Sequence, residues 1–245
     1  MRRLLGLCLC LLPGVVRADD VPPGPPLLVI RELDERRAAM VREVLEESFV
    51  AAGFRIAVLT TDLVDPPAFE RWLATTAEGG AFDSARIVVL GFSAAGVEAA
   101  RLAYRHPTRV GALVLPAALQ PIPTGVDPKA IAPDLPVYLT YGEADTTAPA
   151  RIGEGARTAL EAAGVLVQLD RLPQGDHFGV LRQGAAPMAG WSAIAVACGP
   201  RFRQATALVA AGKRAPAREL LLELARRHPE TRWAEVAARR AAALE

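Results

Sequence analysis

One stretch, Arg86 to Gly96, constrains the fold of this chain more than any other. It begins with Ile87 to Leu90, a short and unbroken apolar run rich in β-branched residues. Such a run is typical of a strand buried on both faces of a parallel sheet. The run leads directly into Gly-Phe-Ser-Ala-Ala-Gly, and the residues from Val97 to Ala103 then read as a helix. The sequence therefore predicts a strand, a sharp turn built of small residues around a serine, and a helix, in immediate succession.

The small residues of this turn have a physical reason. A serine on so tight a turn is strained, and the residues two before and two after it must be small so that strand and helix can approach each other. Gly91 and Ala95 occupy these positions around Ser93. The start of the helix would direct backbone N–H groups towards a negative charge that develops beside the serine. The turn is thus a candidate site for a nucleophilic serine, and an ordinary strand-to-helix turn is the alternative.

The rest of the chain alternates between short apolar runs and amphipathic segments. Strands are expected at 27–30, 56–60, 86–90, 110–115, 136–141 and 165–169, and helices at 34–52, 68–77, 97–105 and 150–163. Alternation with short connections predicts an α/β fold, in which helices cover both faces of a parallel sheet. The functional site is then expected at the carboxyl ends of the strands.

The turn around Ser93 resembles the nucleophile elbow of the α/β-hydrolase family. The usual motif is Gly-x-Ser-x-Gly, and this chain departs from it with Ala95 at the second glycine position and Gly96 one residue later. In that family an acid and then a histidine follow the serine along the chain. The resemblance covers about residues 27 to 181 and implies an α/β-hydrolase fold with a Ser-acid-His triad.

The resemblance also implies an acid for the triad. The expected strand at 136–141 continues into Gly-Glu-Ala-Asp, with Pro149 a few residues on, which is similar to the family segment that carries the acid. Asp145 takes the position of that acid, which must lie on a rigid turn if it is to orient the histidine. Glu143 is the competing carboxylate, at a position that more often faces solvent.

The family's histidine loop has a counterpart after the last expected strand. The segment Gly-Asp-His-Phe there implies that His177 is the base that takes the proton from Ser93. The chain has 3 histidines, and the other two, His106 and His228, each precede a proline at a helix end, where capping explains them. Asp176 is either an alternative group for orienting His177 or a turn residue.

Two backbone N–H groups are expected to stabilise the oxyanion of such an enzyme. One is the N–H of Ala94, which directly follows the serine. The other comes from the loop after the first strand, where most relatives carry His-Gly and this chain has Arg31-Glu32-Leu33. A His-Glu-apolar form of this loop occurs in dienelactone-hydrolase-like members, so the resemblance implies the Leu33 N–H as the second donor. A misformed hole would lower the rate by about 10²–10³ for each missing donor.

The N-terminus has the pattern of a signal peptide at residues 1–18. Arg2 and Arg3 are followed by an apolar run from Leu4 to Val16, too short to span a membrane, and cleavage is expected after Ala18. Residues 19–26 then form a proline-rich linker. This pattern predicts a periplasmic or secreted protein.

The hydrolase domain is expected at 27–199 and a helical extension at 200–245, with turns near 211–213 and 228–230. The extension resembles a tetratricopeptide-like helical hairpin followed by one more helix. A single such unit cannot bury its apolar face alone. It is therefore expected either to pack on the hydrolase domain as a C-terminal cap or to bind a protein partner.

The composition excludes several classes of function. A formal net charge of +1 gives no reason to expect binding to nucleic acid or to an anionic membrane. Stable insertion into a membrane is not expected either, because the N-terminal apolar run is too short to span one. No metal-ligand cluster, phosphate loop or dinucleotide fingerprint is present in the sequence, so no cofactor is expected. Residues 116–135, where many relatives insert a lid, are few and rich in proline, which predicts an open, nearly lidless site.

Two functions follow from these features. The first is a serine hydrolase that cleaves a small or exposed ester or thioester, or an amide, through an acyl-enzyme on Ser93. The second is a catalytically weak or inactive hydrolase-fold protein that serves as a binding or scaffold module in the cell envelope. The missing glycine in the oxyanion loop, Ala95 and the helical tail motivate the second function.

Overall fold

The structure is a computed structural model, and it describes residues 24–63, 65–229 and 231–245. The predicted signal peptide and residues 19–23 of the predicted linker lie outside the described residues. Gly24 and Pro25 lead into the first strand, and the Pro25 carbonyl accepts a hydrogen bond from the Asp83 N–H at 2.9 Å.

Six parallel strands form one sheet with the order β2-β1-β3-β4-β5-β6. Their bounds are β1 (Pro26–Arg31), β2 (Arg55–Leu59), β3 (Asp83–Leu90), β4 (Val110–Pro116), β5 (Val137–Gly142) and β6 (Val167–Leu172). The strands β1, β4 and β5 are buried along their whole length, as their apolar runs predict.

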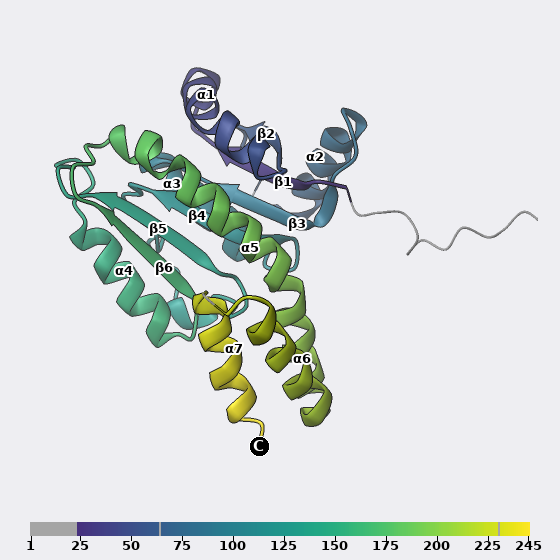
Figure 1. Cartoon of the computed structure of the whole chain (residues 1–245). Coiled ribbons are helices and arrows are strands. Elements are labelled where there is room, and N and C mark those ends of the chain that lie inside the picture. The colour runs from purple at the N-terminus through teal and green to yellow at the C-terminus, as the bar shows by residue number, and fades with distance from the viewer. Residues whose placement is uncertain (1–23, 64, 230) are drawn as a thin grey trace, which may run out of the picture.

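Helices cover both faces of this sheet (Figure 1). They are α1 (Glu35–Ala51), α2 (Pro66–Glu78), α3 (Gly96–Arg105), α4 (Arg151–Ala162), α5 (Gly179–Ala210), α6 (Arg214–Arg227) and α7 (Arg232–Ala242). Helices α1 and α5 contact each other and share one face, while α3 packs on β3 and β4 from the other. Right-handed crossovers place α2 and α4 on the α3 side. The α/β-hydrolase architecture expected from the sequence is therefore the observed one.

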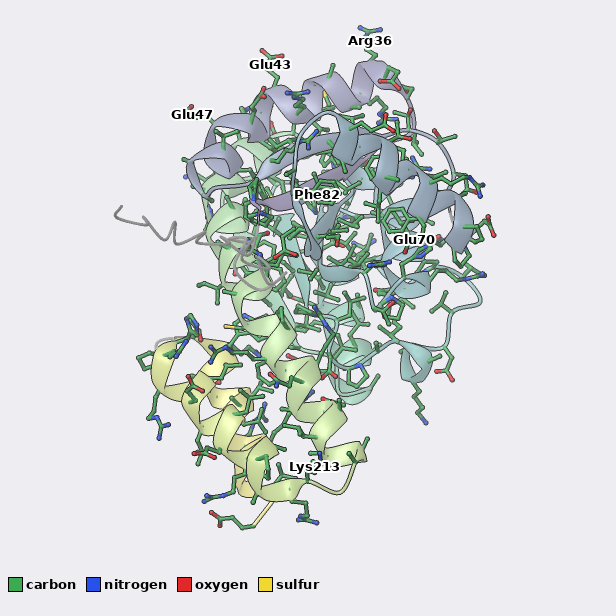
Figure 2. The ribbon with its side chains drawn as sticks, turned by 90° about the vertical axis from the view of Figure 1, so that its right-hand side faces the viewer. Arg36, Glu43, Glu47, Glu70, Phe82 and Lys213 are labelled. Atoms are coloured by element: carbon green, nitrogen blue, oxygen red, sulfur yellow. The ribbon has the colours of Figure 1, made fainter. Side chains whose placement is uncertain are left out.

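The outer surface of α1 is charged. Arg36, Glu43 and Glu47 point away from the sheet in Figure 2, whereas the opposite side of the helix buries Val41, Leu45 and Phe49. The Asp34 carboxylate caps this helix by accepting the Arg37 N–H at 2.8 Å. One apolar stripe and one good N-cap thus explain why the predicted helix at 34–52 forms.

The last strand differs from its expected bounds of 165–169. Val165 instead belongs to the C-terminal turn of α4, because its N–H donates to the Leu160 carbonyl at 3.0 Å. The strand therefore begins at Val167 and continues to Leu172.

The predicted boundary between residues 199 and 200 falls inside α5, which runs without a break from Gly179 to Ala210. The helix carries Pro187 and Pro200 in its interior. The division into a hydrolase domain and an extension stays a prediction, since one helix belongs to both parts.

The two helices after α5 fold back as a hairpin that packs on α5, and Lys213 lies at its far end in Figure 2. Trp233 of α7 is buried against Phe202, with ring centroids 5.3 Å apart, and against Trp191 at 6.5 Å. Arg240 pairs with Asp134 of the hydrolase part at 2.8 Å. Of the two arrangements left open by the sequence, the described residues adopt the C-terminal cap. Within the described part of the chain, no helix is long and apolar enough to cross a membrane.

Candidate active site

The turn after β3 places Ser93 in a strained conformation at the carboxyl end of the sheet. Its φ is +56°, in the left-handed region that residues other than glycine rarely adopt, and the residue is 4% exposed. A Cβ on Gly91 would lie 2.4 Å from the Ala99 Cβ, so strand and helix need glycine there. A Cβ on Gly96 would lie 2.5 Å from the Ala118 Cβ. The second glycine of this motif therefore stands one residue late because the approach of the next loop requires it there.

The segment between β4 and β5 is tied to the serine turn instead of forming a lid. The Leu119 N–H donates to the Ser93 carbonyl at 3.2 Å, and the Tyr141 hydroxyl donates to the Ala118 carbonyl at 2.6 Å. Further along the segment, the Tyr104 hydroxyl of α3 donates to the Pro121 carbonyl at 2.9 Å. These bonds hold the segment against α3 and β5, which agrees with the nearly lidless site expected from the sequence.

Ser93, His177 and Asp145 come together from three separate loops. The Ser93 Oγ lies 2.8 Å from the His177 Nε2, and the His177 Nδ1 lies 2.7 Å from the Asp145 Oδ2. When Nδ1–H donates to the carboxylate, Nε2 is free to accept the serine proton. The Asp145 side chain is fully buried, while the imidazole is 17% exposed. The three residues predicted from sequence motifs thus form a continuous hydrogen-bonded chain.

Two backbone N–H groups and two glycines hold Asp145, the carboxylate at the end of this hydrogen-bonded chain, in place. The second carboxylate oxygen of Asp145 accepts the N–H groups of Thr147 at 2.8 Å and Ala148 at 2.9 Å. The loop of the acid and the loop of the histidine touch at Gly142 and Gly175, where a Cβ on Gly142 would lie only 1.8 Å from the Gly175 carbonyl oxygen. Glycine at 142 is what allows the two loops to come this close.

The two carboxylates that the sequence left as alternatives have other partners. Glu143 forms an ion pair with Arg171 at 2.9 Å on the surface. Asp176 accepts the Gly179 N–H at 2.5 Å through its side chain, which caps the start of α5. Asp145 is therefore the carboxylate that is hydrogen-bonded to His177, and Asp176 is a turn residue.

Apolar side chains surround the serine and the histidine. The Phe92 ring lies 4.9 Å from the His177 ring and 5.6 Å from the Phe178 ring, measured between centroids. Phe92 is buried, but Phe178 is 46% exposed and Leu33, two residues after the end of β1, is 44% exposed. The exposed ring of Phe178, 5.7 Å from the His177 ring between centroids, suits contact with the apolar part of an organic substrate.

The loop after β1 contains a group whose importance the sequence did not indicate. Glu32 is buried, and its Oε2 accepts the N–H of Leu33, the expected oxyanion donor, at 3.4 Å. Burial raises the pKa of Glu32 to about 7. The preceding residue, Arg31, is also buried, and its guanidinium donates to the backbone carbonyls of Glu32 and Leu59. A carboxylate directly after a buried strand was the only available signal.

Cys198 is buried in α5, and burial raises the pKa of its thiol to about 11. It is therefore a structural thiol. Among the residues that the structure describes, no group of three His, Cys, Asp or Glu side chains could hold a metal ion.

Comparisons with known proteins agree with this geometry. Residues 69–182, which include Ser93, Asp145 and His177, match the model of the phospholipase/carboxylesterase family. No curated protein matches the sequence.

Several solved structures resemble most of the chain at low sequence identity. Esterase PE8 is 18% identical, with 69% of this chain and 93% of that chain covered at a TM-score of 0.51. A proposed dienelactone hydrolase from Klebsiella pneumoniae is 20% identical over 70% of this chain and 88% of that chain, with a TM-score of 0.51. A sugar hydrolase from Lactococcus lactis is 12% identical over 71% of this chain and 89% of that chain, with a TM-score of 0.54.

These similarities define the fold. The solved structures show that the chain has the α/β-hydrolase fold. The match to the phospholipase/carboxylesterase family covers the segment that carries the three candidate residues.

Proposed function

We propose that the protein is a serine hydrolase that cleaves a small or exposed ester or thioester through an acyl-enzyme, with Ser93 as nucleophile. The observation that carries this proposal is the pair of short contacts made by His177, 2.8 Å to the Ser93 Oγ and 2.7 Å to Asp145. A hydroxyl next to a neutral imidazole that is itself oriented by a buried carboxylate is the arrangement that activates serine for attack on a carbonyl.

In the proposed mechanism, the Ser93 Oγ attacks the ester carbonyl carbon while its proton passes to the His177 Nε2. Asp145 stabilises the resulting imidazolium and holds its orientation. The N–H groups of Ala94 and Leu33 stabilise the oxyanion. The intermediate then collapses, and the alcohol leaves with the proton from His177. A water molecule, deprotonated by His177, releases the acid in the same way.

The surroundings of Ser93 favour certain substrates over others. Leu33 and Phe178 offer exposed apolar contacts, and the segment between β4 and β5 is bound to α3 and β5 instead of folding over the serine. An open site of this kind suits a short acyl chain or an acyl group presented by a larger molecule. The proposed location is the periplasm or the outside of the cell, on the basis of the sequence of residues 1–18. A protein partner for α6 and α7 stays a prediction.

Hydrolysis of p-nitrophenyl esters of increasing chain length tests the proposal. We expect the protein to cleave the shorter esters and the variants Ser93→Ala and His177→Ala to lose at least about 10³-fold in kcat. Ser84→Ala is the matched control, because Ser84 is an exposed serine near the start of β3. A folded protein that cleaves none of the esters, or that keeps its activity without Ser93, would contradict the proposal and favour a scaffold role.

A further inference from the structure

Glu32 is a buried carboxyl group to which the proposed reaction assigns no role. It follows β1 directly and is 1% exposed. Its Oε2 accepts the Leu33 N–H, whereas its Oε1 is buried without a hydrogen-bond partner among the described residues. A buried carboxylate oxygen without a hydrogen-bond partner costs free energy, so burial favours the neutral form of Glu32 over the ionised form.

The register of the sheet places Glu32 beside the serine turn. Strands β1 and β3 are neighbours, and Ile30 is paired with Leu90. Two residues further along each strand, Glu32 is therefore level with Phe92, the residue before Ser93. The Phe92 backbone amide faces the Glu32 carboxyl and favours its ionised form. The carboxyl thus lies between the loop that carries Leu33 and the turn that carries Ser93.

Burial and most of the polar groups around Glu32 act in opposite directions, so its neutral and ionised forms are close in free energy near pH 7. Burial raises the pKa of Glu32 to about 7. The Leu33 amide, Arg37 and the Phe92 amide lower this pKa, and Asp34 raises it further.

The neighbouring Arg31 does not pair with Glu32. Its guanidinium donates instead to the backbone carbonyls of Glu32 and Leu59. Glu98 and Asp62 are the acidic groups with the largest effect on that guanidinium. Among the described residues, Glu32 therefore forms no ion pair that would fix it in the charged form.

The protonation state of Glu32 changes what the Leu33 N–H can do. An ionised carboxylate accepts hydrogen bonds more strongly than a neutral carboxyl, so ionised Glu32 competes with the substrate oxygen for this N–H. It also places a negative charge near the position where the oxyanion develops, and like charges at short range in a buried site repel strongly. Neutral Glu32 removes both obstacles.

We propose that Glu32 is a positioning residue that controls the oxyanion-binding N–H of Leu33, so that hydrolysis requires Glu32 to be neutral. This inference rests on the proposed function. It assigns to Glu32 no contact with the reacting atoms and no transfer of a proton to the substrate.

The pH dependence of kcat for a short soluble ester tests the inference. A histidine base makes the rate rise as it loses its proton. Above about pH 7, where Glu32 ionises, we expect kcat of the unaltered protein to fall at least about tenfold, part of the 10²–10³-fold effect of one lost oxyanion donor. The fall should appear in kcat more than in KM, because the oxyanion forms only along the reaction path.

Two variants separate this effect from other causes of an alkaline loss. Glu32→Gln cannot ionise, so its kcat should stay level where that of the unaltered protein falls, while Glu43→Gln on the outer surface of α1 should behave like the unaltered protein. Arg37→Gln keeps Glu32 but removes a charge that favours its ionised form, so the alkaline fall should move to higher pH. Arg42→Gln, on the exposed side of α1, should not move it.

Three results would overturn the inference: no alkaline fall in the unaltered protein, an unchanged fall in Glu32→Gln, or an unmoved fall in Arg37→Gln. The last variant alters a partly exposed side chain, so it tests the idea even if Glu32→Gln does not fold. Failure of the proposed function looks different, because it would give no hydrolysis at any pH and no labelling of Ser93 by a fluorophosphonate.

Discussion

At the scale of single residues, the site depends on a few side chains that are held by their second contacts. Asp145 uses one oxygen for His177 and the other for two backbone N–H groups, so it cannot turn away from the imidazole without losing all three bonds. This rigidity is what an orienting acid requires. The strained φ of +56° at Ser93 also indicates a rigid position, since the surrounding packing must hold that conformation.

Replacing Asp145 by asparagine should reduce kcat by roughly 10³–10⁴-fold and leave the fold intact. The amide can still accept the N–H groups of Thr147 and Ala148, but it no longer holds His177 in the tautomer that accepts the serine proton. Ester hydrolysis and circular dichroism measure the two effects. Glu143→Gln is the control, because Glu143 pairs with exposed Arg171 and should leave kcat within about threefold. Equal losses in both variants would contradict the assignment.

Glu32 should also make the stability of the protein depend on pH. Its pKa is raised from 4.5 to about 7, so between these values the folded state keeps a proton that the unfolded state has released. Stability is therefore lost as the pH rises through this window, by about 3 kcal/mol in total. Urea denaturation should show that Glu32→Gln gains stability over the unaltered protein between pH 4.5 and pH 8. Exposed Glu47→Gln should show no such gain, and parallel curves for Glu32→Gln would be the opposing result.

The sequence predicted the three residues of the hydrogen-bonded chain but not the state of Glu32. Ser93, Asp145 and His177 stand in short local motifs at strand ends, where residue type and order carry the information. The burial of Glu32 depends on the packing of α1 and of the serine turn around it, which are distant in sequence. Here the polar Glu32 is buried and its apolar neighbour Leu33 is 44% exposed, which is the opposite of what their polarity predicts.

At the scale of elements, glycines decide how closely the loops of the site approach one another. Gly142→Ala should separate the loop of Asp145 from the loop of His177, since the new Cβ would meet the Gly175 carbonyl oxygen at 1.8 Å. We expect a large loss of kcat together with a destabilisation of more than about 2 kcal/mol. Kinetics and thermal unfolding measure both.

Gly155→Ala is the matched control for this substitution. Gly155 is an exposed residue of α4 and a Cβ there has no atom within 4 Å, so alanine should leave kcat unchanged and raise stability by about 0.5–1 kcal/mol. A Gly142→Ala protein with full activity would show that the contact between the two loops does not position the triad.

The alternation of strands and helices could be predicted because each short apolar run is bounded by turn residues. The part of helix α5 before residue 200 was not predicted, because Gly179, Gly184, Pro187, Gly190 and Pro200 all lower the intrinsic helix propensity of this segment. Its contacts with β3, β4, β5 and α1 outweigh that propensity. Tertiary packing of this kind leaves little trace in a local window of sequence.

At the scale of the whole molecule, α5 joins the C-terminal hairpin to the sheet. Trp233 packs on Phe202 and Trp191 of that helix, so Trp233→Ala should cost roughly 3–5 kcal/mol. Val209→Ala, at an exposed position of α5, should cost less than about 1 kcal/mol.

Because the hydrolase part and the C-terminal hairpin share helix α5, far-UV and near-UV circular dichroism should report one coincident unfolding transition. Two separate transitions would support independent domains instead.

The central claim is that Ser93 is an activated nucleophile, and covalent labelling with a fluorophosphonate tests it most directly. Peptide mapping of the labelled protein should find a single adduct on the peptide that contains Ser93. Labelling should be lost in Ser93→Ala, slowed by at least about 10³-fold in His177→Ala and unchanged in Ser84→Ala. A folded protein that stays unlabelled, or that is labelled equally well without His177, would contradict the account.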